Sequence, residues 1–186
     1  MYTIVESNMQ SKDSPESVSV LVAEAKANPA AFSGLYEHYV QPVYRYLYSR
    51  LGTRPVAEDL TSQTFIAAYE ALPRYRERGH FSAWLFRIAQ SKLMDYFRAR
   101  RFEIEWDSAE NTVDRQDVLT GVIQDEEIGR LRSLIQSLPA NEQDLIRLRY
   151  VAELSYSEMA ELLGKREDAI RKSVQRLLAR LKSQME

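Results

Sequence analysis

Groups that could carry out covalent or metal chemistry are few in this chain of 186 residues. It contains no cysteine, so disulfides and thiolate metal ligands are excluded. Its two histidines, His38 and His80, have no partner at metal-ligand spacing. A glycine-rich phosphate loop and a G-x-S-x-G turn are both missing from the sequence. We therefore expect neither an enzyme nor a cofactor, and the chemistry left to explain is binding.

Basic side chains gather in two segments, although the formal net charge is -2. Lys and Arg outnumber Asp and Glu in residues 87–101 and again in residues 165–182. Between them, residues 103–127 hold nine acidic side chains and one basic side chain, Arg115. Segregated positive charge attracts the phosphates of nucleic acid. The alternative is that each basic segment is only the solvated face of a helix.

Residues 155–182 have the pattern of a helix-turn-helix. Ser155 and Glu158 have the spacing of a capping box, and Gly164 provides a tight turn before a second helix. In that second helix the apolar residues repeat at helical spacing, namely Ile170, Val174, Leu177, Leu178 and Leu181. The remaining surface is mostly basic or polar, with Arg171, Lys172, Gln175, Arg176 and Arg180. One face can pack while the other enters a major groove. An ordinary amphipathic hairpin would show the same spacing.

The elements upstream are also predicted to be helices, because no segment alternates apolar and polar residues for long. Ser14-Pro15 and Asn28-Pro29 each favour a helix start. Pro42 is expected to end or kink the second helix, and Gly52 to cap its continuation. A further helix runs from Thr53 to about residue 72. Another is expected over about 82–101, with Trp84, Leu85, Ile88 and Leu93 as core positions.

The predicted fold class is all-α, with two small helical domains joined by an acidic linker. Residues 1–16 are expected to form a flexible tail, 17–101 the first domain, 102–120 the linker and 121–186 the helix-turn-helix domain. Within the last domain we expect helices over about 121–137, from Pro139 onward, over 155–163 and over about 167–182. The first ten residues lack a signal peptide pattern, and no apolar run reaches the ~20 residues of a membrane span.

Blocks in both halves resemble the extracytoplasmic-function (ECF, group IV) sigma factors of the sigma-70 family. In the C-terminal half these are Leu138-Pro139, Arg149-Tyr150, Leu154-Ser155-Tyr156, Glu158-Met159-Ala160 and Leu163-Gly164. In the N-terminal half they are Ala31-Phe32, Leu35-Tyr36, Tyr39, Ala57-Glu58-Asp59-Leu60, Thr64-Phe65, Phe81 and the run from Trp84 to Ala89. The order and separation of the blocks also match over about residues 17–183. The resemblance implies a factor that binds core RNA polymerase and directs promoter-specific initiation, with residues 17–101 as sigma region 2 and 121–186 as sigma region 4.

The resemblance also implies roles for individual side chains. Docking on the clamp of the largest polymerase subunit would fall to Glu58, Asp59, Gln63 and Phe65. Recognition and melting of the minus-ten element would fall to Tyr75, Arg76, His80, Arg87, Ser91, Lys92, Tyr96, Arg98 and Arg101. Recognition of the minus-thirty-five element would fall to Lys165, Arg166, Arg171, Lys172, Gln175 and Arg176, of which Lys165 and Arg166 are assigned to phosphates.

Several of these residues have a simpler structural explanation. Glu58 and Asp59 lie near a helix start, where acids favour the helix dipole. Phe65 is equally a core residue, and Tyr96 is divided between packing and DNA contact. The family's linker occupies the RNA channel of the polymerase, but a plain solvated linker has the same acidic composition.

Some positions depart from the family pattern. Ser91 stands where members often have Asn, and Ser173 where they often have Arg. Arg166, Asp168 and Ala169 stand where Ser, Gly and Thr are common. These differences concern the preferred promoter sequence rather than the fold.

The resemblance implies three partners: the clamp and flap regions of core RNA polymerase, promoter DNA, and an anti-sigma factor or other regulator. No small-molecule substrate is expected. The implied location is the bacterial cytoplasm, in some cases at the membrane through an anti-sigma factor. The main alternative is a stand-alone helix-turn-helix regulator that binds duplex DNA without polymerase. A helical protein–protein module is a third hypothesis, which the two basic segments disfavour.

Overall fold

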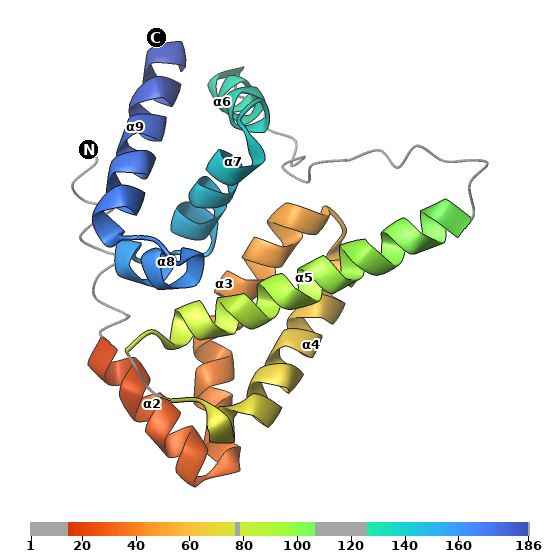
Figure 1. The fold of residues 1–186 in the computed structure, drawn as a ribbon, viewed down its shortest axis with the longest axis vertical. Helices are drawn as coiled ribbons and strands as arrows, with labels where there is room; N and C mark the ends of the chain where they lie inside the picture. The colour runs from red at the N-terminus through yellow and green to blue at the C-terminus, as the bar shows by residue number, and fades with distance from the viewer. Residues whose placement is uncertain (1–14, 77–78, 107–125, 186) are drawn as a thin grey trace.

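The computed structural model describes residues 15–76, 79–106 and 126–185, and in these ranges all regular structure is helical (Figure 1). The expected all-α fold is therefore confirmed. The N-terminal half contains α2 (Pro15–Ala27), η1 (Pro29–Ala31), α3 (Phe32–Leu51), α4 (Arg54–Ala71), η2 (Leu72–Arg74) and α5 (Phe81–Trp106). The C-terminal half contains α6 (Glu126–Gln136), α7 (Ala140–Ile146), the π-helical segment η3 (Arg147–Val151), α8 (Tyr156–Leu163) and α9 (Glu167–Met185).

Helix α3 continues through Pro42, so of the two effects expected of this proline, ending or kinking the helix, the first does not occur. Proline cannot donate the helical hydrogen bond to the carbonyl four residues earlier. The helix persists because the turns on either side bury Tyr39, Val43 and Tyr46 in the core. Gly52 then ends the helix in the left-handed conformation, with φ 78°, as the sequence predicts.

Helix α5 is longer than predicted. It ends at Trp106 rather than near residue 101, because no glycine or proline interrupts residues 81–106. Residues 102–106 of the expected linker are therefore helical, and residues 107–120 lie outside the described ranges. At the other end of the chain, α2 already begins at Pro15, while residues 1–14 of the expected tail are also outside those ranges.

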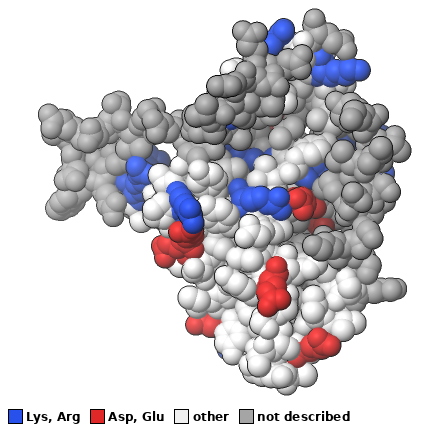
Figure 2. All heavy atoms as spheres, turned by 180° about the vertical axis from the view of Figure 1, so that it is seen from behind, with Lys and Arg blue, Asp and Glu red and all other residues white. Residues whose placement is uncertain are grey.

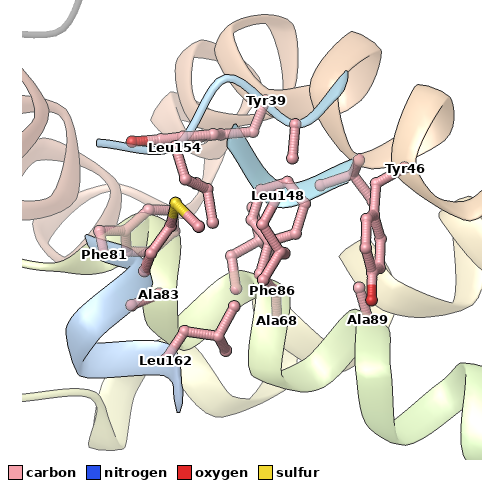
Figure 3. Close-up of a cluster of buried hydrophobic side chains, with 14 of the residues drawn as sticks. Tyr39, Tyr46, Ala68, Phe81, Ala83, Phe86, Ala89, Leu148, Leu154 and Leu162 are labelled. Atoms are coloured by element: carbon pink, nitrogen blue, oxygen red, sulfur yellow. The ribbon is translucent and has the colours of Figure 1, made fainter. Parts of the chain in front are cut away.

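Buried side chains from both halves form one hydrophobic core (Figure 3). Leu148 of η3, Leu154 of the turn before α8 and Leu162 of α8 pack into the same cluster as Tyr39 of α3 and Phe86 of α5. Burial of apolar area is the main force that stabilises such a contact. A smaller cluster joins α9 to α6 through Leu177, Leu181 and Leu138, with Leu134, Ile135 and Ile146 packed against it. The division into two domains remains a prediction, and the two halves share their main core.

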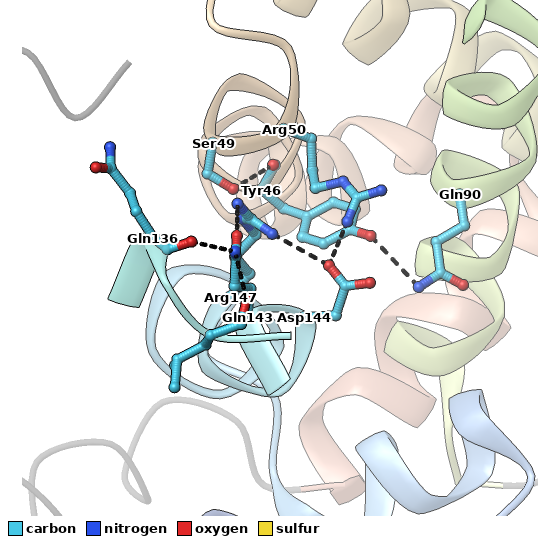
Figure 4. A network of polar contacts seen from close by, with 9 residues as sticks. Tyr46, Ser49, Arg50, Gln90, Gln136, Gln143, Asp144 and Arg147 are labelled. Carbon is cyan, nitrogen blue, oxygen red and sulfur yellow. Dashed lines mark hydrogen bonds and ion pairs between the residues drawn. The ribbon is translucent and has the colours of Figure 1, made fainter. Parts of the chain in front are cut away.

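Polar contacts reinforce the junction between the halves (Figure 4). Arg50 of α3 forms an ion pair with Asp144 of α7, and Arg147 lies 3.3 Å from the same carboxylate. Arg45 and Glu153 form a second ion pair across the junction, at 2.9 Å. Among the described residues, no helix combines the length and apolar content that crossing a membrane requires.

Candidate nucleic-acid interface

Helix α9 divides into a buried and an exposed face. Ile170, Val174, Leu177 and Leu181 are buried against the rest of the C-terminal half, as predicted. Leu178, predicted to share that face, is 37% exposed. At about 100° per residue it lies roughly 70° from the centre of the buried stripe, at the edge of that face.

The local sequence explains how α9 is placed. The Ser155 hydroxyl accepts the Glu158 backbone N–H at 3.2 Å, and the Glu158 carboxylate accepts the Ser155 backbone N–H at 2.7 Å. This confirms the predicted capping box at the start of α8. Gly164 ends α8 with φ 62°, a conformation that favours glycine, and α9 begins three residues later. The predicted helix-turn-helix geometry is therefore present.

All six side chains predicted to meet the minus-thirty-five element are exposed: Lys165, Arg166, Arg171, Lys172, Gln175 and Arg176. They lie on α9 or in the turn before it, opposite the buried stripe. Arg171 forms an ion pair with Glu167 at 2.6 Å. Arg180 pairs with Glu142 of α7, which ties the outer part of α9 to the rest of the half. The exposed face carries enough cations to contact a phosphate backbone.

The residues predicted for the minus-ten element do not share one environment. Arg76, Arg87, Ser91, Arg98 and Arg101 are exposed, whereas His80, Lys92 and Tyr96 are half-buried. Residues 77 and 78 of the loop lie outside the described ranges. Within the exposed set, Arg87, Ser91, Arg98 and Arg101 lie along one side of α5 and form the continuous part of this candidate surface, whereas Arg76 lies in the loop before the helix.

Tyr75, which is predicted to contact the minus-ten element, is buried in this structure. Its ring lies 4.7 Å from the ring of Trp84 and 5.5 Å from that of Phe81, measured between centroids. Lys26 donates a hydrogen bond to the Tyr75 carbonyl at 2.7 Å and so fixes the start of the loop. Aromatic packing therefore accounts for the position of the Tyr75 ring, and its predicted contact with the minus-ten element stays a prediction.

Two exposed apolar side chains on α5 were not predicted as part of the candidate site. Met94 and Phe97 are exposed beside Arg98 and Arg101. An exposed aromatic ring among cations is a suitable surface for stacking an unpaired base. Sequence spacing indicates the position of Met94, because Ser91, Met94, Arg98 and Arg101 recur every three or four residues and so lie on one side of the helix.

The same helix also contacts α8. Arg87 donates a hydrogen bond to the Glu161 carbonyl at 3.0 Å, and Ser82 is hydrogen-bonded to the Glu158 carboxylate. One candidate DNA-contacting arginine is thus engaged within the molecule. Tyr96 packs against the core and accepts a hydrogen bond from Arg100 at 3.1 Å, so packing accounts for most of its surroundings.

The predicted polymerase-binding residues lie on α4. Glu58, Asp59 and Gln63 are exposed, and Gln63 donates a hydrogen bond to Asp59 at 2.9 Å. Ile66 continues the same face and is also exposed, a residue that the sequence analysis did not single out. Phe65 is only 4% exposed and packs edge-on against Tyr36, with 4.9 Å between centroids. Phe65 therefore packs into the core beneath the exposed face of α4 in this arrangement, and its predicted polymerase contact stays a prediction.

Figure 2 shows how charge is distributed over the face turned away from the view of Figure 1. Lys and Arg side chains on this face lie across the middle and the top of the molecule, over the C-terminal half and α5. The Asp and Glu side chains lie from the middle downward. The acidic stretch predicted between the two basic segments lies mostly outside the described residues, so its separation from them stays a prediction.

The chain matches two protein families. Sigma-70 region 2 matches residues 35–103, and sigma-70 region 4 matches residues 128–181. Among curated proteins, the ECF RNA polymerase sigma factor SigD of Mycobacterium tuberculosis is 33% identical over 180 residues, covering 91% of this chain and 84% of SigD. The ECF RNA polymerase sigma factor BldN of Streptomyces coelicolor is 37% identical over 171 residues, covering 87% of this chain. This chain spans 64% of the length of BldN.

Two solved structures have a similar fold. CnrH, in complex with the cytosolic domain of CnrY, has a TM-score of 0.59 and 24% identity over 88% of this chain and 94% of CnrH. The sigma factor RpoE from Bartonella quintana, in complex with the anti-sigma factor NepR, has a TM-score of 0.59 and 21% identity. That match covers 83% of this chain and 96% of RpoE. At these identities the structures support the fold alone.

Proposed function

The chain belongs to the ECF sigma factors of the sigma-70 family, and from that membership we propose that it binds core RNA polymerase and directs initiation at two-element promoters. Phosphodiester chemistry then belongs to the polymerase, and this chain contributes binding. The observation that carries the proposal is the division of α9 into a buried apolar stripe and an exposed basic face. A helix of that kind, set by a capped turn, fits the major groove of the minus-thirty-five element.

We assign the minus-ten element to the exposed side of α5. Arg98 and Arg101 supply cations for the backbone, while Met94 and Phe97 supply apolar surface for an unstacked base. Ser91 lies on the same side and offers a hydroxyl to a base edge. Tyr75 acts through the packing of the loop.

We assign polymerase docking to the exposed face of α4, with Glu58, Asp59, Gln63 and Ile66. Exposed acids next to an apolar side chain suit a helical partner that presents cations around an apolar strip. Asp59, Gln63 and Ile66 fall on one face because they are separated by four and three residues.

Binding both promoter elements requires the two halves to separate. By their names the elements are about 25 base pairs apart, or roughly 85 Å of duplex at 3.4 Å per base pair. A compact chain of 186 residues has a radius of gyration of only about 16 Å. The contact of α5 with α8, including the Arg87 hydrogen bond to Glu161, therefore opens on the promoter.

A further partner follows from the same membership. CnrH and RpoE are each described in complex with another protein, and for RpoE that protein is an anti-sigma factor. We include an anti-sigma factor or comparable regulator among the partners of this chain. The location that fits these partners is the bacterial cytoplasm, or its membrane face where such a regulator is anchored there.

Polymerase docking can be tested with the double substitution Asp59→Ala and Gln63→Ala. We expect it to weaken the affinity for purified core polymerase by about tenfold or more, since truncating central interface residues typically costs 1 to 2 kcal/mol or more. The matched control is Glu37→Ala with Gln41→Ala, an acid and a glutamine at the same spacing on the exposed surface of α3. The control should bind core like the wild type.

Fluorescence titration of labelled chain with core polymerase measures both affinities. Equal affinity of the α4 variant and the wild type would refute the docking assignment. If the wild type binds duplex DNA tightly but does not bind core at all, the stand-alone regulator becomes the better account.

A further inference from the structure

The ring of Tyr156, the first residue of α8, lies against two guanidinium groups. The Arg149 guanidinium carbon is 4.7 Å from the ring centroid, and that of Arg171 is 5.1 Å from it. Both distances are within the range of a cation–π attraction. Arg149 comes from η3 and Arg171 from the first turns of α9, so one aromatic ring joins three elements of the helix-turn-helix half.

Arg149 also connects the Tyr156 ring to the backbone before α8. It donates a hydrogen bond to the Leu154 carbonyl at 2.9 Å, which anchors the turn that leads into α8. Its Nε is buried. The Tyr156 ring therefore lies against a guanidinium that is itself held by the backbone preceding α8.

Arg171 is held on two sides and is still accessible. Glu167 accepts a hydrogen bond from Arg171 at 2.6 Å, and the Tyr156 ring lies against its guanidinium. Half of the Arg171 side chain, 50%, remains exposed. A guanidinium has five N–H donors in a rigid fork, so the contact with Glu167 leaves donors for a partner.

A fixed guanidinium in the first turns of a recognition helix suits one kind of ligand. Two parallel donors match the O6 and N7 atoms of guanine in the major groove, the most frequent specific contact of arginine with DNA. A flexible arginine would meet phosphates and bases alike and would lose more conformational freedom on binding. Ordering of the guanidinium before binding therefore favours recognition of a base over nonspecific attraction to DNA.

Resting on the proposed function, we propose that Tyr156 is a positioning residue that orients Arg171 toward one guanine of the minus-thirty-five element. Tyr156 determines the preference at a single base pair through the side chain that it holds. The sequence resemblance assigns Arg171 to this element but gives Tyr156 no role in recognition.

Two substitutions at Tyr156 separate the aromatic face from simple packing. Tyr156→Phe keeps the ring, and Tyr156→Leu keeps apolar volume without a π face. Tyr156→Met serves the same purpose as Leu if the leucine variant melts at a lower temperature than the wild type. Arg171→Ala removes the side chain that is being positioned and identifies the base pair that it reads.

The measurement is selection of duplex DNA from a library randomised over the minus-thirty-five element, with the full-length chain, alone and bound to core polymerase. We expect Arg171→Ala to reduce the preference for guanine at one base pair by about tenfold. Tyr156→Leu should reduce it at the same base pair by about threefold, Tyr156→Phe should leave it unchanged, and the other base pairs should keep their preferences. Tyr156→Leu combined with Arg171→Ala should be no worse than Arg171→Ala alone.

The outcomes separate the two proposals. If the wild type selects a sequence but Tyr156→Leu keeps the full preference at the Arg171 base pair, the positioning role is wrong while the proposed function stands. If Tyr156→Phe and Tyr156→Leu weaken every base pair equally, Tyr156 is only a packing residue. A wild-type chain that selects no sequence in either format contradicts both proposals.

Discussion

Tyr46 places a phenol between the two halves of the molecule, where its hydroxyl accepts a hydrogen bond from Gln90 at 3.4 Å (Figure 4). Burial raises the pKa of Tyr46 above its ordinary value, against smaller opposing effects of the Gln90 hydrogen bond and of Arg50. A raised pKa in the folded state means that the folded chain retains the proton at a pH where the unfolded chain has lost it. The resulting stability is present below about pH 10 and is lost as the pH rises further.

Removing the titrating group should therefore remove part of this alkaline sensitivity. We expect the free energy of unfolding to fall less steeply above about pH 10 for Tyr46→Phe than for the wild type. Urea titrations at a series of pH values between 8 and 11, about the range of phenol ionisation, measure the two slopes. Identical slopes would show that Tyr46 does not contribute to the pH dependence.

Single residues mark the limit of prediction from helical spacing. The alternation of buried and exposed positions on α9 is predictable, because Ile170 and Val174 repeat with the helix period. Helical spacing does not predict whether Phe65 and Tyr75 face a partner or the core, because both orientations give the same spacing. Neighbouring rings decided the matter: Phe65 packs on Tyr36, and Tyr75 packs on Trp84.

At the scale of the element, the start of α8 depends on a reciprocal pair of hydrogen bonds. Ser155 and Glu158 satisfy each other's backbone N–H groups, and Glu158 also binds Ser82 of α5. We expect Ser155→Ala to lower the free energy of unfolding by about 1 kcal/mol. The control Ser62→Ala replaces an exposed serine within α4 and should have little effect, because alanine is favourable in a helix interior.

Urea denaturation of the three proteins by circular dichroism tests this expectation. A loss for Ser155→Ala no larger than that for Ser62→Ala would mean that the capping box contributes little to stability.

Helix ends signalled by specific residues were predictable, and those decided by packing were not. Gly52 and Gly164 both end helices in the left-handed conformation that glycine allows. Pro42 does not end α3, because the core contacts of the flanking turns outweigh one missing hydrogen bond. The extension of α5 to Trp106 follows from the absence of glycine and proline in a segment whose acidic charge favoured a linker prediction.

At the scale of the whole molecule, the shared core predicts that the free chain unfolds in one transition. Leu148 is fully buried and packs with residues of the N-terminal half, so Leu148→Ala should lower the free energy of unfolding by about 2 to 5 kcal/mol. Both tryptophans, Trp84 and Trp106, lie in α5. A change in the C-terminal half should therefore move the unfolding midpoint that tryptophan fluorescence reports.

The helical signal is an independent observable, and its unfolding midpoint should shift together with the midpoint from tryptophan fluorescence. If Leu148→Ala shifts only part of the helical signal and leaves the fluorescence midpoint unchanged, the two halves fold separately in solution. Such a result would contradict the contact between the two halves in the free chain.

The junction between the halves was beyond sequence prediction. Arg50 and Asp144 are 94 positions apart, and neither residue carries a local signal of the other. Periodicity indicates which side of a helix is apolar, but not which helix covers it. The apolar residues of η3 and α8 therefore predict helices, but they do not predict that these helices pack on α3 and α5.

The most direct test of the central claim is transcription with bacterial core polymerase, the full-length chain and a library of randomised promoter DNA. The account predicts initiation that depends on both proteins, from sequences that share two separated motifs. Arg171→Ala should change the upstream motif without changing the downstream one. Core polymerase that starts transcription equally well without the chain, or products that share no motif, would contradict it.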